Sequence, residues 1–123
     1  NFAMHILRTE QLELVHRLGF RTGRDGTKLG DGEWRTLASG SPVLRECFGY
    51  FDCRVFRTLD MGPSTLVIGS VLEAGMGEGT GDAMTSPYWR ANMPEEWREE
   101  FEAQLVEAQE IGAAYLREHP EFA

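Results

Sequence analysis

Three stretches of the chain have the side-chain pattern of β-strands. Residues Phe2–Leu7 alternate between two faces, and Phe48–Met61 is the longest stretch with a two-residue period. Ser64–Leu72 is rich in β-branched residues, which favour strands. Because only the turn-forming segment Asp60–Pro63 separates the last two stretches, we expect them to form a hairpin.

The helical period predicts one helix near each end. Thr9 is the expected N-cap of a short amphipathic helix whose apolar positions run from Leu12 to Leu18 and which ends at Gly19. Pro94 suits the first turn of a second helix, which runs to about Glu118. This helix carries an apolar stripe of Trp97, Phe101, Leu105, Ala108, Ile111 and Tyr115. Packing on the domain or on a second copy is the expected role of the stripe, and docking of a foreign partner is the alternative.

The remaining segments read as irregular. We expect Trp34–Ser41 to lack regular structure, with a turn at Gly40–Pro42 and a short buried piece at Val43–Leu44. Gly75–Ser86 is glycine-rich and acidic, and Thr80 stands where a G-x-G-x-x-G motif needs its last glycine. We therefore expect this segment to be a flexible linker.

The composition and charge of the chain argue against several classes of function. The chain has 123 residues and a formal net charge of −8, which argues against a surface for nucleic acid or for anionic lipid. No apolar run is long enough to span a bilayer. Cys47 and Cys53 have neither C-x-x-C nor zinc-ligand spacing, so two buried thiols in a reducing compartment are expected. With no visible signal peptide, we expect a cytoplasmic protein.

The histidines do not indicate a catalytic group. His5 lies in an expected strand, His16 in a helix and His119 near the C-terminus. Their order with serine, cysteine and aspartate residues matches no catalytic triad. We therefore expect neither a catalytic side chain nor a metal site.

The segment Leu18–Leu29 carries the most informative chemistry. It holds three glycines and the cations Arg21, Arg24 and Lys28 on an otherwise acidic chain. Two interpretations stand: an ordinary helix-to-strand connection with exposed cations, or a contact for a flavin or nucleotide. In the second, the hydroxyl of Thr22 and backbone N–H groups near Gly23 would bind a polar edge, and Arg24 or Lys28 would offset phosphate charge.

The order of these features resembles the flavin reductase-like family. The matching segments cover Asn1 to about Ala74 and are, in chain order, the strand Asn1–Leu7, the loop Phe20–Asp25 with Lys28, Gly40–Leu44, Phe51–Val55 and Gly62–Val71. The family commonly has Phe-x-Ser-Gly-x-Asp, Gly-x-Pro-Val-Leu, a Cys-Arg-Val strand and Gly-x-His-x-Leu-x-x-Gly-Glu-Val in the same order.

The resemblance implies a mainly β fold: an antiparallel, FMN-binding split barrel of six strands with flanking helices and a long C-terminal helix. Residues 1–93 would form the barrel portion, and residues 94–123 a helix that packs on it or on the partner of a homodimer. The family's first half precedes the residues that match Asn1 onward. We therefore expect the N-terminal part of the barrel to be missing from this chain.

The implied activity is reduction of flavin by NAD(P)H, or electron transfer through bound FMN, with FAD as an alternative cofactor. The flavin carries the redox chemistry, so no side-chain acid or base is required. The cofactor-binding residues would be Arg21, Thr22, Gly23, Arg24, Asp25 and Lys28, with Ser64 contacting the substrate. The alternatives are an interaction subunit without cofactor that uses the C-terminal helix, and a flavin-dependent oxygenase-like protein.

Three positions and one segment depart from the family pattern. Thr22 replaces the usual Ser and keeps the hydroxyl, Ser64 stands where His is common, and Ser70 stands where Glu is frequent. The His is expected near the nicotinamide or flavin pocket, so Ser64 bears on oxidation of the pyridine nucleotide more than on flavin binding. The absent first half is the largest departure, since it carries much of the FMN contact.

Overall fold

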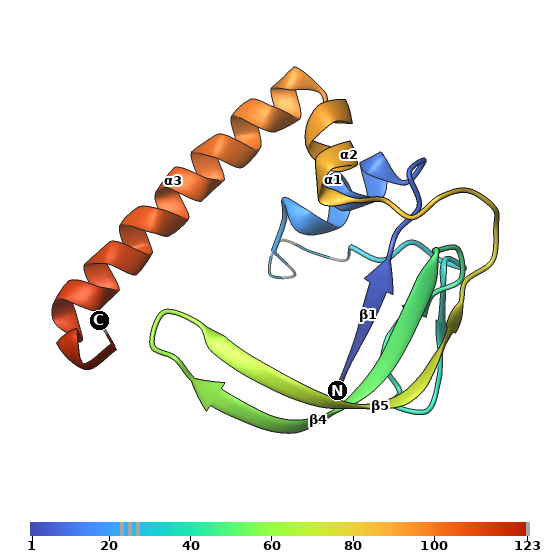
Figure 1. The fold of residues 1–123 in the computed structure, drawn as a ribbon, viewed down its shortest axis with the longest axis horizontal. Coiled ribbons are helices and arrows are strands. Elements are labelled where there is room, and N and C mark those ends of the chain that lie inside the picture. The colour runs from blue at the N-terminus through green and yellow to red at the C-terminus, as the bar shows by residue number, and fades with distance from the viewer. Residues whose placement is uncertain (23, 25, 27, 123) are drawn as a thin grey trace.

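The computed structural model describes residues 1–22, 24, 26 and 28–122 (Figure 1). Five strands and three α-helices make up the described part. In chain order the elements are β1 (Phe2–Ile6), α1 (Leu12–Gly19), β2 (Trp34–Thr36), β3 (Pro42–Leu44), β4 (Gly49–Asp60), β5 (Thr65–Met76), α2 (Ser86–Asn92), α3 (Glu95–Glu118) and the 3₁₀ turn η2 (Pro120–Phe122).

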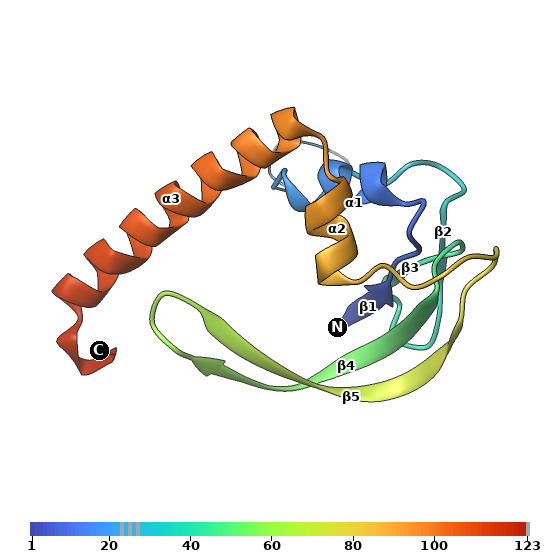
Figure 2. The same cartoon turned by 45° about the horizontal axis from the view of Figure 1, so that its top comes forward.

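The main sheet is antiparallel, with strand order β1-β4-β5. The expected hairpin is confirmed: β4 pairs with β5 from Gly49↔Met76 to Asp60↔Thr65. Register shifts interrupt the ladder at Asp52/Cys53 and at Val55/Arg57. Such bulges bend and twist a strand pair, and the hairpin is strongly curved (Figure 2).

The core lies where the second, two-stranded sheet meets the first. Sheet β2–β3 is antiparallel, so the prediction that Trp34–Ser41 is irregular is wrong for its first three residues. Val43 and Cys47 are fully buried and pack with Leu44 and Tyr50. The partly buried residues around this cluster are Ala3, Leu7, Leu14, Trp34 and Leu37. Within the described residues the two sheets do not close into a barrel.

A buried carboxylate fixes the turn that precedes β3. Asp52 on β4 is fully buried. Its Oδ2 accepts a hydrogen bond from the Ser39 N–H at 2.8 Å, and its Oδ1 accepts one from the Ser39 hydroxyl. The same hydroxyl oxygen accepts from the Ser41 N–H at 3.0 Å. These bonds compensate the desolvation of the carboxylate and hold β3 against the main sheet.

The glycine-rich segment after β5 is an ordered loop, so the linker prediction is wrong. The buried guanidinium of Arg8 donates to the carbonyl oxygens of Gly81 at 2.7 Å and Gly79 at 2.9 Å. It also lies 3.4 Å from the carbonyl oxygen of Gly77. A Cβ atom at Gly77 would collide with the backbone of Cys47, which explains the glycine there.

The helices differ from expectation mainly at their starts. The N-cap of α1 is Gln11 rather than Thr9, whose N–H instead donates to the carbonyl oxygen of Asp82 at 3.0 Å. Helix α2, which the pattern did not predict, has the Thr85 side chain as its cap. Helix α3 covers nearly the expected range, with Pro94 as N-cap. In the part of the chain that the structure describes, no helix is long and apolar enough to cross a membrane.

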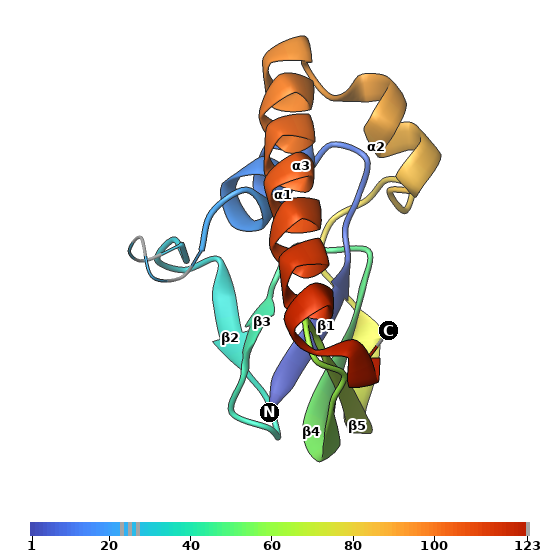
Figure 3. The same cartoon turned by 90° about the vertical axis from the view of Figure 1, so that its left-hand side faces the viewer.

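Helix α3 reaches from α1 and α2 to the tip of the β4–β5 hairpin (Figures 1 and 3). At the tip, a Cβ atom on Gly62 would lie 2.9 Å from ring atoms of both Tyr115 and Phe122, so the C-terminal segment packs on this turn. Gly62 has a φ of +85°, which only glycine adopts without strain. The helix is therefore held at both ends, whereas Leu105, Val106 and Ile111 in its middle are exposed.

His5 links the two sheets and should make stability depend on pH. Its Nε2 accepts a hydrogen bond from the Leu44 N–H at 3.0 Å, which requires a neutral ring. Burial lowers the pKa of His5 below its ordinary value of 6.5. The unfolded chain therefore binds more protons between the two pKa values. This contribution to the free energy of unfolding is complete above about pH 6.5 and is lost as the pH falls through the lowered, folded-state pKa.

We expect the free energy of unfolding, measured by urea denaturation, to decrease from neutral to mildly acidic pH. The variant His5→Gln keeps an acceptor for the Leu44 N–H but does not titrate, so its decrease should be smaller. All other titratable groups are the same in both proteins, so the difference between the two slopes isolates His5. Equal slopes would contradict the assignment.

Candidate functional site

The loop that the sequence singles out begins at the C-terminal end of α1. Phe20 is the C-cap, and its N–H donates to the carbonyl oxygen of His16 at 3.2 Å. Of the predicted cofactor-binding residues, the structure describes Arg21, Thr22, Arg24 and Lys28. The predicted positions Gly23 and Asp25 lie outside the described residues.

Lys28 serves the loop itself. Its ammonium donates to the carbonyl oxygen of Leu18 at 2.8 Å and also to that of Arg21. A helix leaves its last carbonyl groups without partners, and a cation at this end is favourable for the helix dipole. Lys28 therefore stabilises the end of α1 and is not a free cation.

Arg21 and Arg24 are the cations that remain available. Both residues are exposed. Within the described part of the chain, neither guanidinium group has a hydrogen bond or an ion pair. The Arg24 N–H donates to the Thr22 hydroxyl oxygen at 3.3 Å, which links these two loop positions. Two unpaired guanidinium groups on one short loop can pair with a phosphate without first breaking another contact.

The backbone of this loop leaves room for a ligand. Gly26 has a φ of +130°, and nothing lies within 4 Å of the position of a Cβ atom there. The open space at Gly26 and the two unpaired guanidinium groups fit the phosphate end of a flavin mononucleotide. They do not by themselves provide a surface for its ring.

The far end of the loop is closed by an ion pair that sequence reasoning missed. Glu33 Oε2 lies 2.7 Å from Arg17 Nη2 on α1 and accepts a hydrogen bond from the Gly30 N–H at 3.1 Å. Both side chains are about two-fifths exposed, so the pair contributes at most about 1 kcal/mol to stability. Its main effect is to hold the end of the loop, near Glu33, against α1.

Two cavities flank α1 beside this loop. One, of about 420 Å³, lies between α1, Glu33 and Trp97. The other, of about 330 Å³, is lined mostly by apolar groups of α1, α2 and α3, including Phe20, Trp89 and Phe101. Aromatic side chains thus surround the start of the loop.

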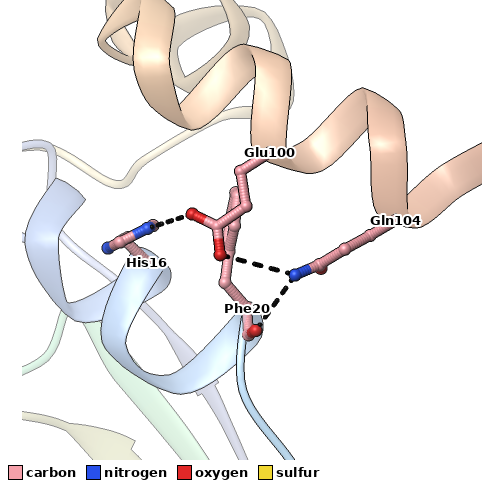
Figure 4. Close-up of polar contacts among 4 residues, drawn as sticks. All are labelled: His16, Phe20, Glu100 and Gln104. Carbon is pink, nitrogen blue, oxygen red and sulfur yellow. Dashed lines mark hydrogen bonds and ion pairs between the residues drawn. The ribbon is translucent and has the colours of Figure 1, made fainter.

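Helix α3 also contacts the start of the loop, through residues that the sequence did not single out (Figure 4). His16 Nε2 lies 2.8 Å from Glu100 Oε2, and Gln104 Nε2 donates to the carbonyl oxygen of Phe20 at 3.1 Å. The pairs are 84 residues apart in the chain, so no local pattern indicates them.

Ser64, the predicted substrate contact, lies at the tip of the hairpin. Its carbonyl oxygen accepts a hydrogen bond from the Met61 N–H at 2.9 Å. The tip packs against the C-terminal segment, as the contacts of Gly62 show. Within the described residues, the structure therefore does not bring Ser64 together with the Arg21–Lys28 loop.

The cysteines are not reactive groups. Cys47 and Cys53 are both buried and unpaired, as expected. Burial raises the pKa of the Cys47 thiol, although Arg8 and Arg35 oppose the shift. A buried thiol that stays protonated is a poor nucleophile. The described residues also contain no group of side chains that could hold a metal ion.

Comparison with known proteins identifies the family. Residues 1–96 match the family model of the flavin reductase like domain. Over 79 residues the chain is 32% identical to SmoA, an FMN reductase (NADH) of Agrobacterium fabrum; the match covers 64% of this chain and 43% of SmoA.

Solved structures show the same fold. A flavin reductase domain protein from an Arthrobacter species superposes with a TM-score of 0.55 at 22% identity, over 66% of this chain and 48% of that one. An FMN-binding protein from Thermus thermophilus, solved with p-hydroxybenzaldehyde, also gives 0.55, at 23% identity, over 63% and 43%. The chain thus spans less than half the length of these proteins.

The role of Lys28 can be tested by stability. We expect Lys28→Met to lower the free energy of unfolding by about 1 kcal/mol, because the carbonyl groups at the end of α1 lose their partner. Arg24→Met on the same loop removes a charge without removing a contact and should change it by less than about 0.5 kcal/mol. Urea denaturation of both variants checks this. Equal effects would mean that Lys28 does not stabilise the helix end.

Proposed function

The chain belongs to the flavin reductase-like domain family, and from this premise we propose that it is part of an FMN-binding oxidoreductase. In the proposed reaction, electrons pass from NAD(P)H to flavin or through bound FMN. The family match over residues 1–96 is the observation that carries the proposal. NADH is the favoured donor, because the curated relative SmoA is an FMN reductase (NADH).

The residues of the loop have separate parts in this proposal. Arg21 and Arg24 neutralise the phosphate of FMN, since both guanidinium groups are exposed and unpaired within the described residues. The hydroxyl of Thr22 would contact the polar edge of the cofactor, and Gly23 and Asp25 are proposed as further contacts. Lys28 holds the loop in place through the carbonyl groups of α1. Bound flavin supplies the redox chemistry, and the protein binds and orients it.

Ser64 is proposed as a contact for the nicotinamide. It lacks the imidazole that the family often has at this position, and its hydroxyl offers a smaller polar group. Because Ser64 lies at the hairpin tip, away from the Arg21–Lys28 loop, the proposed site needs a second copy of the chain or further polypeptide to bring the two regions together.

The exposed surface of the hairpin supports a completed split barrel that forms a homodimer. Phe56, which lies at the second register shift, is 75% exposed, and Val71 is 55% exposed. The same part of the hairpin exposes Val55, Leu59, Leu66, Val67 and Ile68. Large apolar side chains exposed along one hairpin support an interface there. Further polypeptide and a second copy would cover it and supply the ring-binding wall that the loop lacks.

Flavin titration tests the proposed function. The full-length protein should bind FMN, seen as quenching of flavin fluorescence, and should oxidise NADH in its presence. Arg21→Gln and Arg24→Gln should each weaken FMN binding by about tenfold, because each removes a charge-assisted contact to the phosphate.

Two controls make the titration specific. Riboflavin has no phosphate, so its affinity should be the same for these variants and for the unsubstituted protein. Arg45→Gln removes an exposed cation that is not on the loop and should leave FMN binding unchanged. A full-length protein that binds neither FMN nor FAD would refute the proposal and favour a subunit without cofactor.

Sedimentation tests the dimer. Phe56→Glu should convert the full-length protein from dimer to monomer while it remains folded, because the side chain is already exposed. Ile111→Glu places the same charge on exposed α3 and should leave the dimer intact. If Ile111→Glu gave a monomer and Phe56→Glu left the dimer intact, the interface would lie on α3. If the unsubstituted protein were a monomer, a dimer interface would be excluded on both surfaces.

A further inference from the structure

The start of the proposed flavin loop is held by a helix that lies far away in the sequence. The carbonyl oxygen of Phe20, the last group before the loop, accepts a hydrogen bond from Gln104 Nε2 at 3.1 Å (Figure 4). A C-cap carbonyl has no partner within its own helix. Gln104 supplies that partner from α3, one helical turn after Glu100.

Glu100 fixes the orientation of the side-chain amide of Gln104. Its Oε1 lies 3.5 Å from Gln104 Nε2, and its Oε2 lies 2.8 Å from His16 Nε2. An ionised carboxylate and a backbone carbonyl can only accept hydrogen bonds, so the amide NH₂ end of Gln104 must face both of them. One carboxylate therefore bridges α1 and the amide that binds Phe20.

Aromatic packing sets the distance between the two helices. The ring of His16 stacks on Trp97, with centroids 4.3 Å apart and planes 3° from parallel. Phe20 contacts Phe101 on α3 at 6.0 Å and Trp89 on α2 at 6.2 Å between ring centroids. These contacts keep α3 close enough for Gln104 to reach the backbone of Phe20.

The loop is thus fixed at its start from two directions. Lys28, a residue of the loop, binds the carbonyl groups of Leu18 and Arg21. Gln104 binds the carbonyl group of Phe20, between them in the chain. Arg21, one of the two free cations, follows Phe20 directly. A rotation of the Phe20–Arg21 peptide would move this guanidinium group away from its place.

The exposure of these contacts indicates what they do. The Glu100 side chain is 43% exposed, and an ion pair or hydrogen bond at such a site contributes little to global stability. The same contact can still select one backbone conformation of a short segment, since local order requires far less free energy than the whole fold.

We propose that Gln104, oriented by Glu100, is a positioning residue for the flavin phosphate: it holds the Phe20 carbonyl so that Arg21 and Arg24 present their guanidinium groups together. This inference rests on the proposed function of the loop. It gives α3 a role in cofactor binding beyond packing and assembly.

The test compares Gln104→Leu with Gln109→Leu in the full-length protein. Gln109 lies on the same helix, is exposed and has no side-chain hydrogen bond in the described structure. Gln104→Leu should weaken FMN binding about tenfold and leave riboflavin affinity unchanged, whereas Gln109→Leu should leave both unchanged. Thermal midpoints of the two variants should agree within a few degrees.

A second measurement needs no cofactor. Trypsin cleaves after Arg21, Arg24 and Lys28, and mass spectrometry can follow these cuts separately from all others. Gln104→Leu should speed cleavage at these positions several-fold, because the start of the loop has lost a contact, and Gln109→Leu should not. If Gln104→Leu fails to fold, Gln104→Glu replaces it, because a carboxylate of the same shape cannot donate to Phe20.

The outcomes separate the two proposals. An unsubstituted protein that binds no flavin refutes the proposed function. A protein that binds FMN, with Gln104→Leu equal to Gln109→Leu in affinity, overturns the positioning role alone. Faster cleavage of Gln104→Leu with unchanged FMN affinity overturns it as well, since the contact would then be purely structural.

Discussion

The arrangement of this molecule depends on one buried guanidinium group. Arg8 follows β1 and donates to carbonyl groups of the loop after β5, which would otherwise carry unsatisfied acceptors toward the core. Positive φ values at Gly79 and Gly81 turn the backbone so that these carbonyl groups converge. The backbone N–H of Arg8 also donates a hydrogen bond to Gln11 Oε1, at the start of α1. One residue thus joins the beginning of α1 to the segment that leads into α2.

Local patterns predicted the elements whose stability is local. The β4–β5 hairpin and α3 are long and periodic, and the structure confirms both within a few residues. Strand β2 was missed because a three-residue strand exists only through its pairing with β3. The ordered loop after β5 was read as a linker because its partner, Arg8, lies about 70 residues earlier. Helix α2 did have a signal, since Thr85 followed by Ser86 and Pro87 is a typical start of a helix.

In the candidate site, too, some features could be predicted from the sequence and others could not. Composition alone left the loop as either an ordinary connection or an anion contact, and the order of the family motifs favoured the second. The structure then separates cations that look equivalent in the sequence: Lys28 is bound to backbone carbonyl groups, whereas Arg21 and Arg24 are unpaired within the described residues. The contacts of Gln104 and Glu100 could not be predicted, because they depend on where a distant helix docks.

Helix α3 is held at both ends, and this imposes a constraint on its length. At a rise of about 1.5 Å per residue, its 24 residues span about 36 Å between the loop after α1 and the hairpin tip. Gln104 and Tyr115 must therefore stay in fixed rotational phase around one axis. Inserting or deleting one residue between them would turn one end by about 100° relative to the other, so that both contacts cannot form together. The length of α3 and the rotational phase of its residues are therefore constrained by the two surfaces that the helix joins.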